Sequence, residues 1–143
     1  MIIEKPSKYF KSDCEVVGGV IEHDGKILLL HRQDHKPEGN TWGGPSGKIE
    51  SNETPEKAVI REIKEETGIK IGERQLKSYG KLFVHYPNYD FIYYLFYIKL
   101  ENLPEIKIEN KEHKNFIWVR PEEALKMNLI EDEDFCIKQI FKI

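Results

Sequence analysis

The sequence predicts an α/β (α+β) fold in which a mixed β-sheet lies between α-helices. Stretches rich in Val, Ile, Leu and aromatic residues, typical of strands, alternate along the chain with segments that carry helix start and stop signals. One stretch, residues 91–98, is almost entirely apolar, as expected of a central strand covered on both faces. No repeat and no Pro/Gly/Ser-rich linker divides the 143 residues, so we expect one domain over residues 1–143.

The first predicted elements are two strands within residues 14–32, which are rich in Val, Ile and Leu. They meet at Asp24-Gly25, a dipeptide that suits the positive φ angles of a tight hairpin. Residues 33–53 are polar and dense in Gly and Pro, which predicts a loop with a short strand around Trp42. Loops of this kind often carry functional residues.

A helix is predicted from Pro55 to Thr67. Thr54 is a good N-cap, Pro55 fits the first helical position, and Gly68 suits the left-handed residue just past the end. Residues 75–100 then predict two long strands around a turn at residues 87–90, and residues 115–119 predict a further short strand. Two closing helices are expected within residues 120–127 and 131–143.

The composition argues against several classes of protein. A formal net charge of −3 gives no global basic field, so binding to nucleic acid through charge is not indicated. The N-terminal residues lack the apolar core of a secretion signal, and the longest apolar run, residues 91–98, is too short to cross a bilayer. We therefore expect a cytoplasmic protein without a membrane partner. Cys14 and Cys136 lie outside any C-x-x-C spacing, which argues against structural zinc. Without an export signal, two reduced thiols are favoured over a disulfide between them.

Acidic residues crowd one side of the predicted helix. At 100° per residue, an apolar stripe that should pack on the sheet is formed by Val59, Ile60 and Ile63. The adjoining face carries three carboxylates, those of Glu62, Glu65 and Glu66. On a charged helix this pattern is often only a solvated face. Here a Gly-rich loop precedes the helix, and Mg²⁺ is held by a few carboxylates plus substrate phosphates, so a metal site also fits.

The spacing from Gly47 to Ile69 matches G-x5-E-x7-R-E-U-x-E-E-x-G-U, where U is aliphatic. Every fixed position is filled, by Gly47, Glu53, Arg61, Glu62, Ile63, Glu65, Glu66, Gly68 and Ile69. This pattern is the signature of the Nudix hydrolases, and residues 47–69 resemble the Nudix box of that family. The order of strands, loop and helix around the box is also similar to the family across most of the chain.

The resemblance implies a loop-helix-loop site in an α/β/α sandwich, which hydrolyses a nucleoside diphosphate linked to another group. Its implied metal ligands are Glu62, Glu65, Glu66 and the Gly47 carbonyl, with Mg²⁺ as cofactor and Mn²⁺ as a substitute. Glu62 or Glu65 is the implied general base, and Arg61 is expected to hold Glu53 in a bidentate pair. Relatives commonly carry Pro-Gly-Gly where this chain has Pro45-Ser46-Gly47. Since serine tolerates positive φ poorly, an altered loop path is one expectation.

Three residues outside the box complete the candidate site. Many relatives place another acidic ligand or base before the strand at 115–119, where this chain has Glu112; the alternative is a surface acid. Trp42 and Tyr86 are candidates for contact with the substrate, although aromatic residues in strands are more often core residues. The five histidines show no H-E-x-x-H spacing, so we expect ordinary surface or core roles for them.

Substrate cues are weak and rank three classes. The pattern formed by Glu112, His113, Trp118 and Val119 is similar to one found in enzymes that act on nucleoside triphosphates. Nucleoside triphosphates therefore rank first as substrates. Tyr86, 17 positions after Ile69, resembles dinucleoside polyphosphate hydrolases, which rank second, and ADP-sugars rank third. A non-catalytic nucleotide-sensing domain and a purely structural acidic domain are the alternatives from other classes. The sequence leaves the oligomeric state open, a homodimer included.

Overall fold

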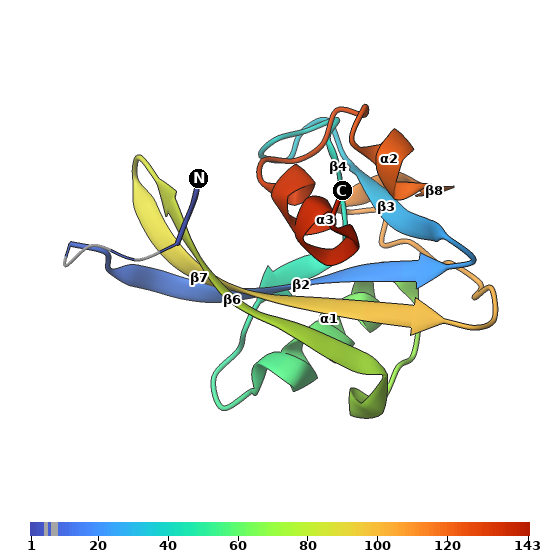
Figure 1. The fold of residues 1–143 in the computed structure, drawn as a ribbon, viewed down its shortest axis with the longest axis horizontal. Coiled ribbons are helices and arrows are strands. Elements are labelled where there is room, and N and C mark those ends of the chain that lie inside the picture. The colour runs from blue at the N-terminus through green and yellow to red at the C-terminus, as the bar shows by residue number, and fades with distance from the viewer. Residues whose placement is uncertain (5, 7–8) are drawn as a thin grey trace.

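The computed structural model describes residues 1–4, 6 and 9–143 and shows a curled mixed sheet with helices on both sides (Figure 1). The strand order is β1-β6-β7-β2-β3-β4, with β5 paired to β2 and β8 paired to β3. The strands are β1 (Ile2–Ile3), β2 (Ser12–His23), β3 (Lys26–Arg32), β4 (Trp42–Gly43), β5 (Ser46–Lys48), β6 (Leu76–Tyr86), β7 (Tyr89–Leu100) and β8 (His113–Val119). The helices are α1 (Pro55–Thr67), the 3-10 helix η1 (Glu73–Gln75), α2 (Pro121–Ala124) and α3 (Glu133–Phe141).

The predicted hairpin and central strand are confirmed. Asp24 and Gly25 have φ angles of 50° and 78°, and they join β2 to β3 as expected. β7 lies between β6 and β2, antiparallel to the first and parallel to the second. Its Phe96 packs in one apolar core and its Leu95 in another on the opposite face. The sheet therefore has both faces covered around β7.

The helix α1 has the predicted bounds and builds the first of these cores. The Thr54 hydroxyl accepts a hydrogen bond from the Lys57 amide at 3.1 Å, and Gly68 ends the helix with φ 79°. Val59 and Ile63 are fully buried against β2 and β3. On the other face of the sheet, α3 buries Ile137 and its neighbours (Figure 1).

Some boundaries predicted from the sequence are wrong. The turn predicted at residues 87–90 is only Pro87-Asn88, since β7 already begins at Tyr89, which pairs with Tyr86. The helix predicted at residues 120–127 is one turn long, and that predicted at 131–143 covers Glu133–Phe141. The helices are shorter than predicted because the chain between them forms hydrogen bonds with β4. The Trp42 amide donates to the Asn128 carbonyl, and the Ile130 amide donates to the Trp42 carbonyl, which keeps this segment extended.

Two further expectations concern the cysteines and membranes. Cys14 and Cys136 are both free thiols, as predicted. Among residues 1–4, 6 and 9–143, no helix has the length and apolar character that a membrane crossing requires.

Candidate functional site

The loop and helix of the predicted box meet at Gly47 and Glu62. β5 pairs with β2 through Gly47 and Val17, which brings the backbone of Gly47 against the Glu62 side chain. A Cβ atom at position 47 would overlap the Glu62 carboxyl group. Glycine at position 47 therefore leaves room for the Glu62 carboxyl group, and a larger residue would displace it; the backbone angles of Gly47 do not call for glycine. Ser46 lies in β5 outside the positive-φ region, so no altered loop path follows from the serine.

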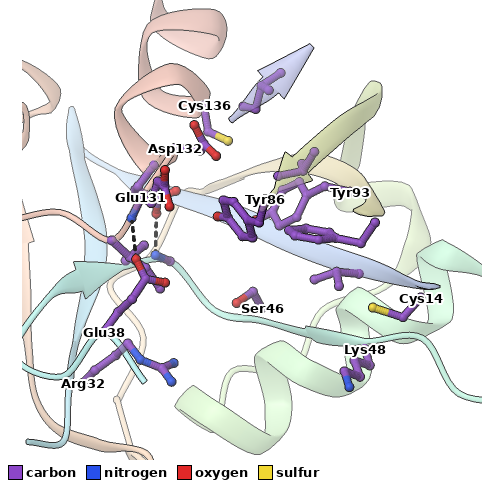
Figure 2. Close-up of a pocket in the computed structure, with 18 of the residues that line it drawn as sticks. Cys14, Arg32, Glu38, Ser46, Lys48, Tyr86, Tyr93, Glu131, Asp132 and Cys136 are labelled. Carbon is purple, nitrogen blue, oxygen red and sulfur yellow. Dashed lines mark hydrogen bonds between the residues drawn. The ribbon is translucent and has the colours of Figure 1, made fainter. Parts of the chain in front are cut away.

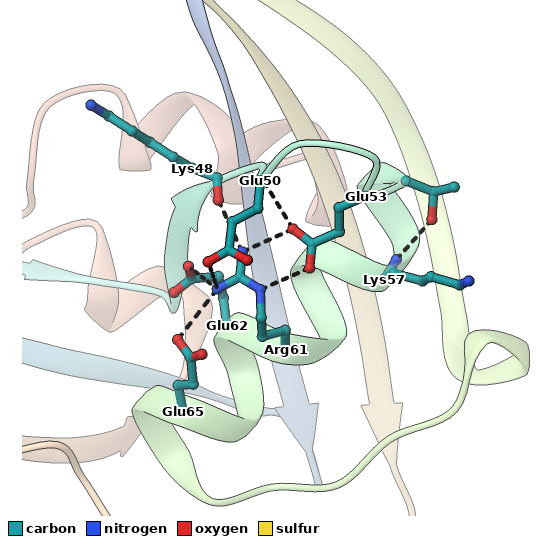
Figure 3. A network of polar contacts seen from close by, with 8 residues as sticks. Lys48, Glu50, Glu53, Lys57, Arg61, Glu62 and Glu65 are labelled. Carbon is teal, nitrogen blue, oxygen red and sulfur yellow. Dashed lines mark hydrogen bonds and ion pairs between the residues drawn. The ribbon is translucent and has the colours of Figure 1, made fainter.

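Arg61 connects the loop to three carboxylates of the box (Figure 3). Its Nε and Nη2 donate to the two Glu53 carboxylate oxygens at 2.8 and 3.0 Å, which is the expected bidentate pair. Nη1 donates to Glu62 Oε1 at 2.8 Å and to Glu65 Oε2 at 3.3 Å, and Nη2 also donates to the Lys48 carbonyl at 3.0 Å. One guanidinium thus fixes the loop, the helix and two of the predicted ligands at once.

The pKa values of Glu53 and Glu62 shift in opposite directions, because contact with Arg61 dominates for the first and burial for the second. The hydrogen bonds from Arg61 lower the pKa of Glu53 to about 2, and the same contacts raise the pKa of Arg61 above its ordinary value. Burial raises the pKa of Glu62 despite the contact with Arg61. Glu53 is thus a firmly ionised partner of Arg61, whereas Glu62 carries a charge that its surroundings disfavour.

Glu66 is the most buried of the three helix acids, with 5% of its surface exposed. Its Oε2 accepts a hydrogen bond from the Ser46 amide at 2.9 Å. Burial, followed by the nearby charges of Glu62 and Glu112, raises the pKa of Glu66 well above its ordinary range. A bound divalent cation would reverse these effects, because it stabilises the ionised carboxylates that burial and repulsion disfavour.

Glu112 and His113 join Glu66 from the start of β8. Ligand atoms of Glu66, Glu112 and His113 all lie within 4.8 Å of one another. His113 is 3% exposed, and its Nδ1 lies 3.8 Å from Glu66 Oε1. Burial, together with Arg32 and Lys36, lowers the pKa of His113 to about 4, so the imidazole is neutral. The structure therefore places Glu112 beside the box, together with the buried His113, a histidine for which the sequence predicted an ordinary surface or core role.

A cavity of about 230 Å³ opens beside this acidic cluster. Ser46 and His113 line it, which connects it directly to Glu66. Aromatic rings form one wall, from Tyr86, Tyr89, Phe91 and Tyr93. Carboxylates from the segment entering α3 form the facing wall, from Glu131, Asp132 and Glu133. Figure 2 shows Tyr86 and Tyr93 facing this segment, with Arg32 and Lys48 at the lower side of the view.

The two predicted aromatic contacts have different positions. Tyr86 lines the cavity, and its ring lies 5.3 Å from that of Tyr89, centroid to centroid. Trp42 is not among the residues that line it; instead its ring stacks on His31 at 4.1 Å and packs against the core beneath α3. Sequence reasoning had no signal for the acidic wall, because residues 131–134 read as the first turn of a helix.

Glu133 stands out in that wall because it is buried, with 7% of its surface exposed. Its Oε1 accepts a hydrogen bond from the Gly44 amide at 2.5 Å. Burial raises the pKa of Glu133 to about 7, partly opposed by the Gly44 hydrogen bond. A protonated Glu133 can donate a hydrogen bond as well as accept one.

Known proteins resemble this chain in sequence and in fold. The family model described as NUDIX domain matches residues 14–139. A CTP pyrophosphohydrolase of Escherichia coli strain K12 is 32% identical over 123 residues, covering 80% of this chain and 82% of that protein. A dihydroneopterin triphosphate diphosphatase of Haemophilus influenzae is 29% identical over 146 residues, covering 91% and 88%. The crystal structure of a MutT NUDIX hydrolase from Burkholderia pseudomallei superposes with a TM-score of 0.77 at 26% identity, covering 89% of this chain and 97% of that one.

Proposed function

This chain belongs to the NUDIX family of hydrolases, and from this premise we propose that residues 1–143 form one domain that acts as a metal-dependent pyrophosphohydrolase of nucleoside triphosphates. The observation that carries the proposal is that the carboxylates of Glu62 and Glu112 both lie next to the buried carboxylate of Glu66. Burial, together with the charges of Glu62 and Glu112, raises the pKa of Glu66, and a cation next to these carboxylates would stabilise their ionised forms. The cluster therefore fits a divalent metal, with Mg²⁺ or Mn²⁺ as the expected ion.

The donor set consists of oxygens suited to such an ion, namely Glu62, Glu65, Glu66, Glu112 and the Gly47 carbonyl. When bound, the metal supplies charge to neutralise phosphate oxygens and lowers the pKa of a water ligand. Glu53 and Arg61 position these groups: their bidentate pair fixes the loop, and Arg61 orients Glu62 and Glu65. Both Glu62 and Glu65 are candidates for the base that accepts the proton of the attacking water.

The neighbouring cavity supports a nucleotide as substrate. At about 230 Å³ it is smaller than the roughly 300–1,000 Å³ of pockets that enclose drug-sized ligands, so it suits one ring system rather than a whole nucleotide. Tyr86 and Phe91 offer ring faces for stacking, and Asp132 and Glu133 offer acceptors for N–H groups of a base edge. Arg32 and Lys48 supply positive charge for phosphates. The relatives that act on CTP and on dihydroneopterin triphosphate favour a triphosphate over the alternatives.

A substrate panel tests the proposal. The protein is incubated with Mg²⁺ or Mn²⁺ and with nucleoside triphosphates, dinucleoside polyphosphates and ADP-sugars, and the products are separated by chromatography. We expect a nucleoside triphosphate to give the monophosphate and pyrophosphate, and Glu66→Gln to lower kcat/KM at least about a hundredfold, because loss of groups that only orient metal ligands already costs 10–100-fold. Glu122→Gln makes the same charge change on the exposed surface of α2 and should retain the rate.

The outcomes separate the alternatives. If only dinucleoside polyphosphates or ADP-sugars are cleaved, the triphosphate assignment is wrong while the hydrolase assignment stands. If nothing in the panel is turned over but nucleotides bind, a nucleotide-sensing domain replaces the enzyme. The pH dependence of kcat in Glu62→Gln and Glu65→Gln identifies the base, since the variant without it loses the acidic limb of the profile.

A further inference from the structure

His113 carries a buried nitrogen that lacks a hydrogen-bond partner. The side chain is 4% exposed, and among the residues that the structure describes none makes a hydrogen bond with Nδ1. Most buried polar side-chain atoms in proteins have a partner, and one without a partner calls for an explanation such as an ion. The nearest candidate is the Glu66 carboxylate, whose Oε1 lies 3.8 Å from Nδ1, beyond hydrogen-bond distance.

The separation of these two atoms fits a shared ion. Metal bonds to nitrogen or carboxylate oxygen are about 2.1 Å long, so two ligands of one ion lie from about 3 Å apart at a right angle to about 4 Å apart when opposite. The distance of 3.8 Å from Nδ1 to Glu66 Oε1 falls within that range. Glu112 lies next to this pair, because ligand atoms of all three residues lie within 4.8 Å of one another.

The pairing of β8 with β3 brings Glu112 and His113 to Glu66 together. His113 pairs with Arg32 as the first residue of β8, and the register shifts by one residue between this pair and the next. Glu112 lies in the turn just before β8, where the alternation of side chains along a strand does not apply. The Glu112 carbonyl accepts from the Gln33 amide at 2.8 Å, which fixes this turn against the end of β3.

We infer that His113 Nδ1 is a metal ligand, in one site with Glu66 and Glu112, and that this nitrogen makes the site prefer Mn²⁺ over Mg²⁺. Mg²⁺ takes oxygen ligands almost exclusively. Mn²⁺ is the weakest nitrogen binder among the first-row transition metals, but as one of them it accepts an imidazole beside carboxylates more readily than Mg²⁺ does. The inference rests on the proposed function for the presence of an ion, and it goes beyond that function by assigning a nitrogen donor and the metal preference that follows. The competing explanation is a purely structural histidine whose Nδ1 approaches Glu66 without an ion.

Pulsed electron paramagnetic resonance of the Mn²⁺-loaded protein tests the inference without an activity measurement. We expect modulation from a directly bonded ¹⁴N nucleus, and its replacement by the ¹⁵N pattern in protein grown with ¹⁵N-histidine. The signal should disappear in His113→Gln and persist in His35→Gln, which changes an exposed histidine. By titration, His113→Gln should weaken Mn²⁺ roughly 10–100-fold, while the affinity for Mg²⁺ changes less than about threefold because Mg²⁺ gains little from nitrogen.

The results distinguish failure of this inference from failure of the proposed function. If the protein binds no Mn²⁺ even with a non-hydrolysable nucleoside triphosphate analogue present, both are overturned. If Mn²⁺ binds but the wild-type protein shows no histidine nitrogen coupling, or the coupling survives in His113→Gln, only the ligand assignment is wrong. Circular dichroism establishes whether His113→Gln folds, and if it does not, absence of ¹⁵N-histidine coupling in the unchanged chain still refutes the ligand assignment.

Discussion

Replacing Glu133 with glutamine should make the stability of this protein less dependent on pH. Burial raises the pKa of Glu133 to about 7, against an ordinary value of 4.5. Between these two values the folded chain holds a proton on Glu133 that the unfolded chain releases. Stability contributed by this group is therefore complete below pH 4.5, and it falls as the pH rises through 7.

The size of the effect follows from those two values. For each pH unit in which only the folded state holds this proton, the free energy of unfolding falls by about 1.4 kcal/mol. The rise in the pKa of Glu133 from 4.5 to about 7 therefore lowers the free energy of unfolding by about 3 kcal/mol by pH 8. Glutamine keeps an oxygen that can accept from the Gly44 amide but has no charge to bury. The free energy of unfolding of Glu133→Gln, relative to that of wild type, should therefore rise by about 3 kcal/mol between pH 4.5 and pH 8.

Urea denaturation of both proteins at several pH values measures this difference, with EDTA present so that metal binding does not contribute. The raised pKa values of Glu62 and Glu66 impose a slope of the same sign, but wild type and variant share it, so subtraction isolates Glu133. Asp134→Asn removes an exposed charge from the same helical turn and should keep most of the wild-type slope. A difference between Glu133→Gln and wild type that is the same at pH 4.5 and pH 8 would refute the reasoning.

The parts of the fold that the sequence predicts are those set by local chemistry. The bounds of α1 follow from Thr54, Pro55 and Gly68, and the hairpin between β2 and β3 follows from Asp24-Gly25. Strands β1 and β5 escaped prediction because they are short and exist only through pairing with β6 and β2. The end of α2 was also unpredictable, since it depends on hydrogen bonds between Trp42 and residues 128–130.

The candidate site also has one part that local sequence predicts and another that depends on strand pairing. The box is recognisable because its carboxylates and Arg61 lie at fixed spacings along one loop and helix. The cluster with His113 depends instead on the register of β8 against β3, which no local spacing encodes. The substrate contact of Trp42 stays a prediction: its ring stacks on His31 and packs against the core beneath α3, and it does not line the cavity.

Two further substitutions test the loop–helix contact. Gly47→Ala should lower kcat/KM roughly a hundredfold, because the new Cβ displaces the Glu62 carboxylate and misplacement by about 1 Å is enough for such a loss; Gly72→Ala, where a Cβ meets nothing within 4 Å, is the control, and equal rates in both variants would contradict the prediction. Arg61→Lys should destabilise the protein by roughly 1.5–3 kcal/mol at pH 7, since a single ammonium cannot reproduce the bidentate bond to Glu53 together with the bond to Glu62. The hydrogen bonds from Arg61 lower the pKa of Glu53 to about 2, so the stability that this carboxylate contributes is present above pH 4.5 and is lost as the pH falls through 2. The difference in free energy of unfolding between Arg61→Lys and wild type, measured by urea denaturation, should therefore shrink between pH 4.5 and pH 2. A difference that stays constant over this range would show that the ion pair of Arg61 with Glu53 is not its cause.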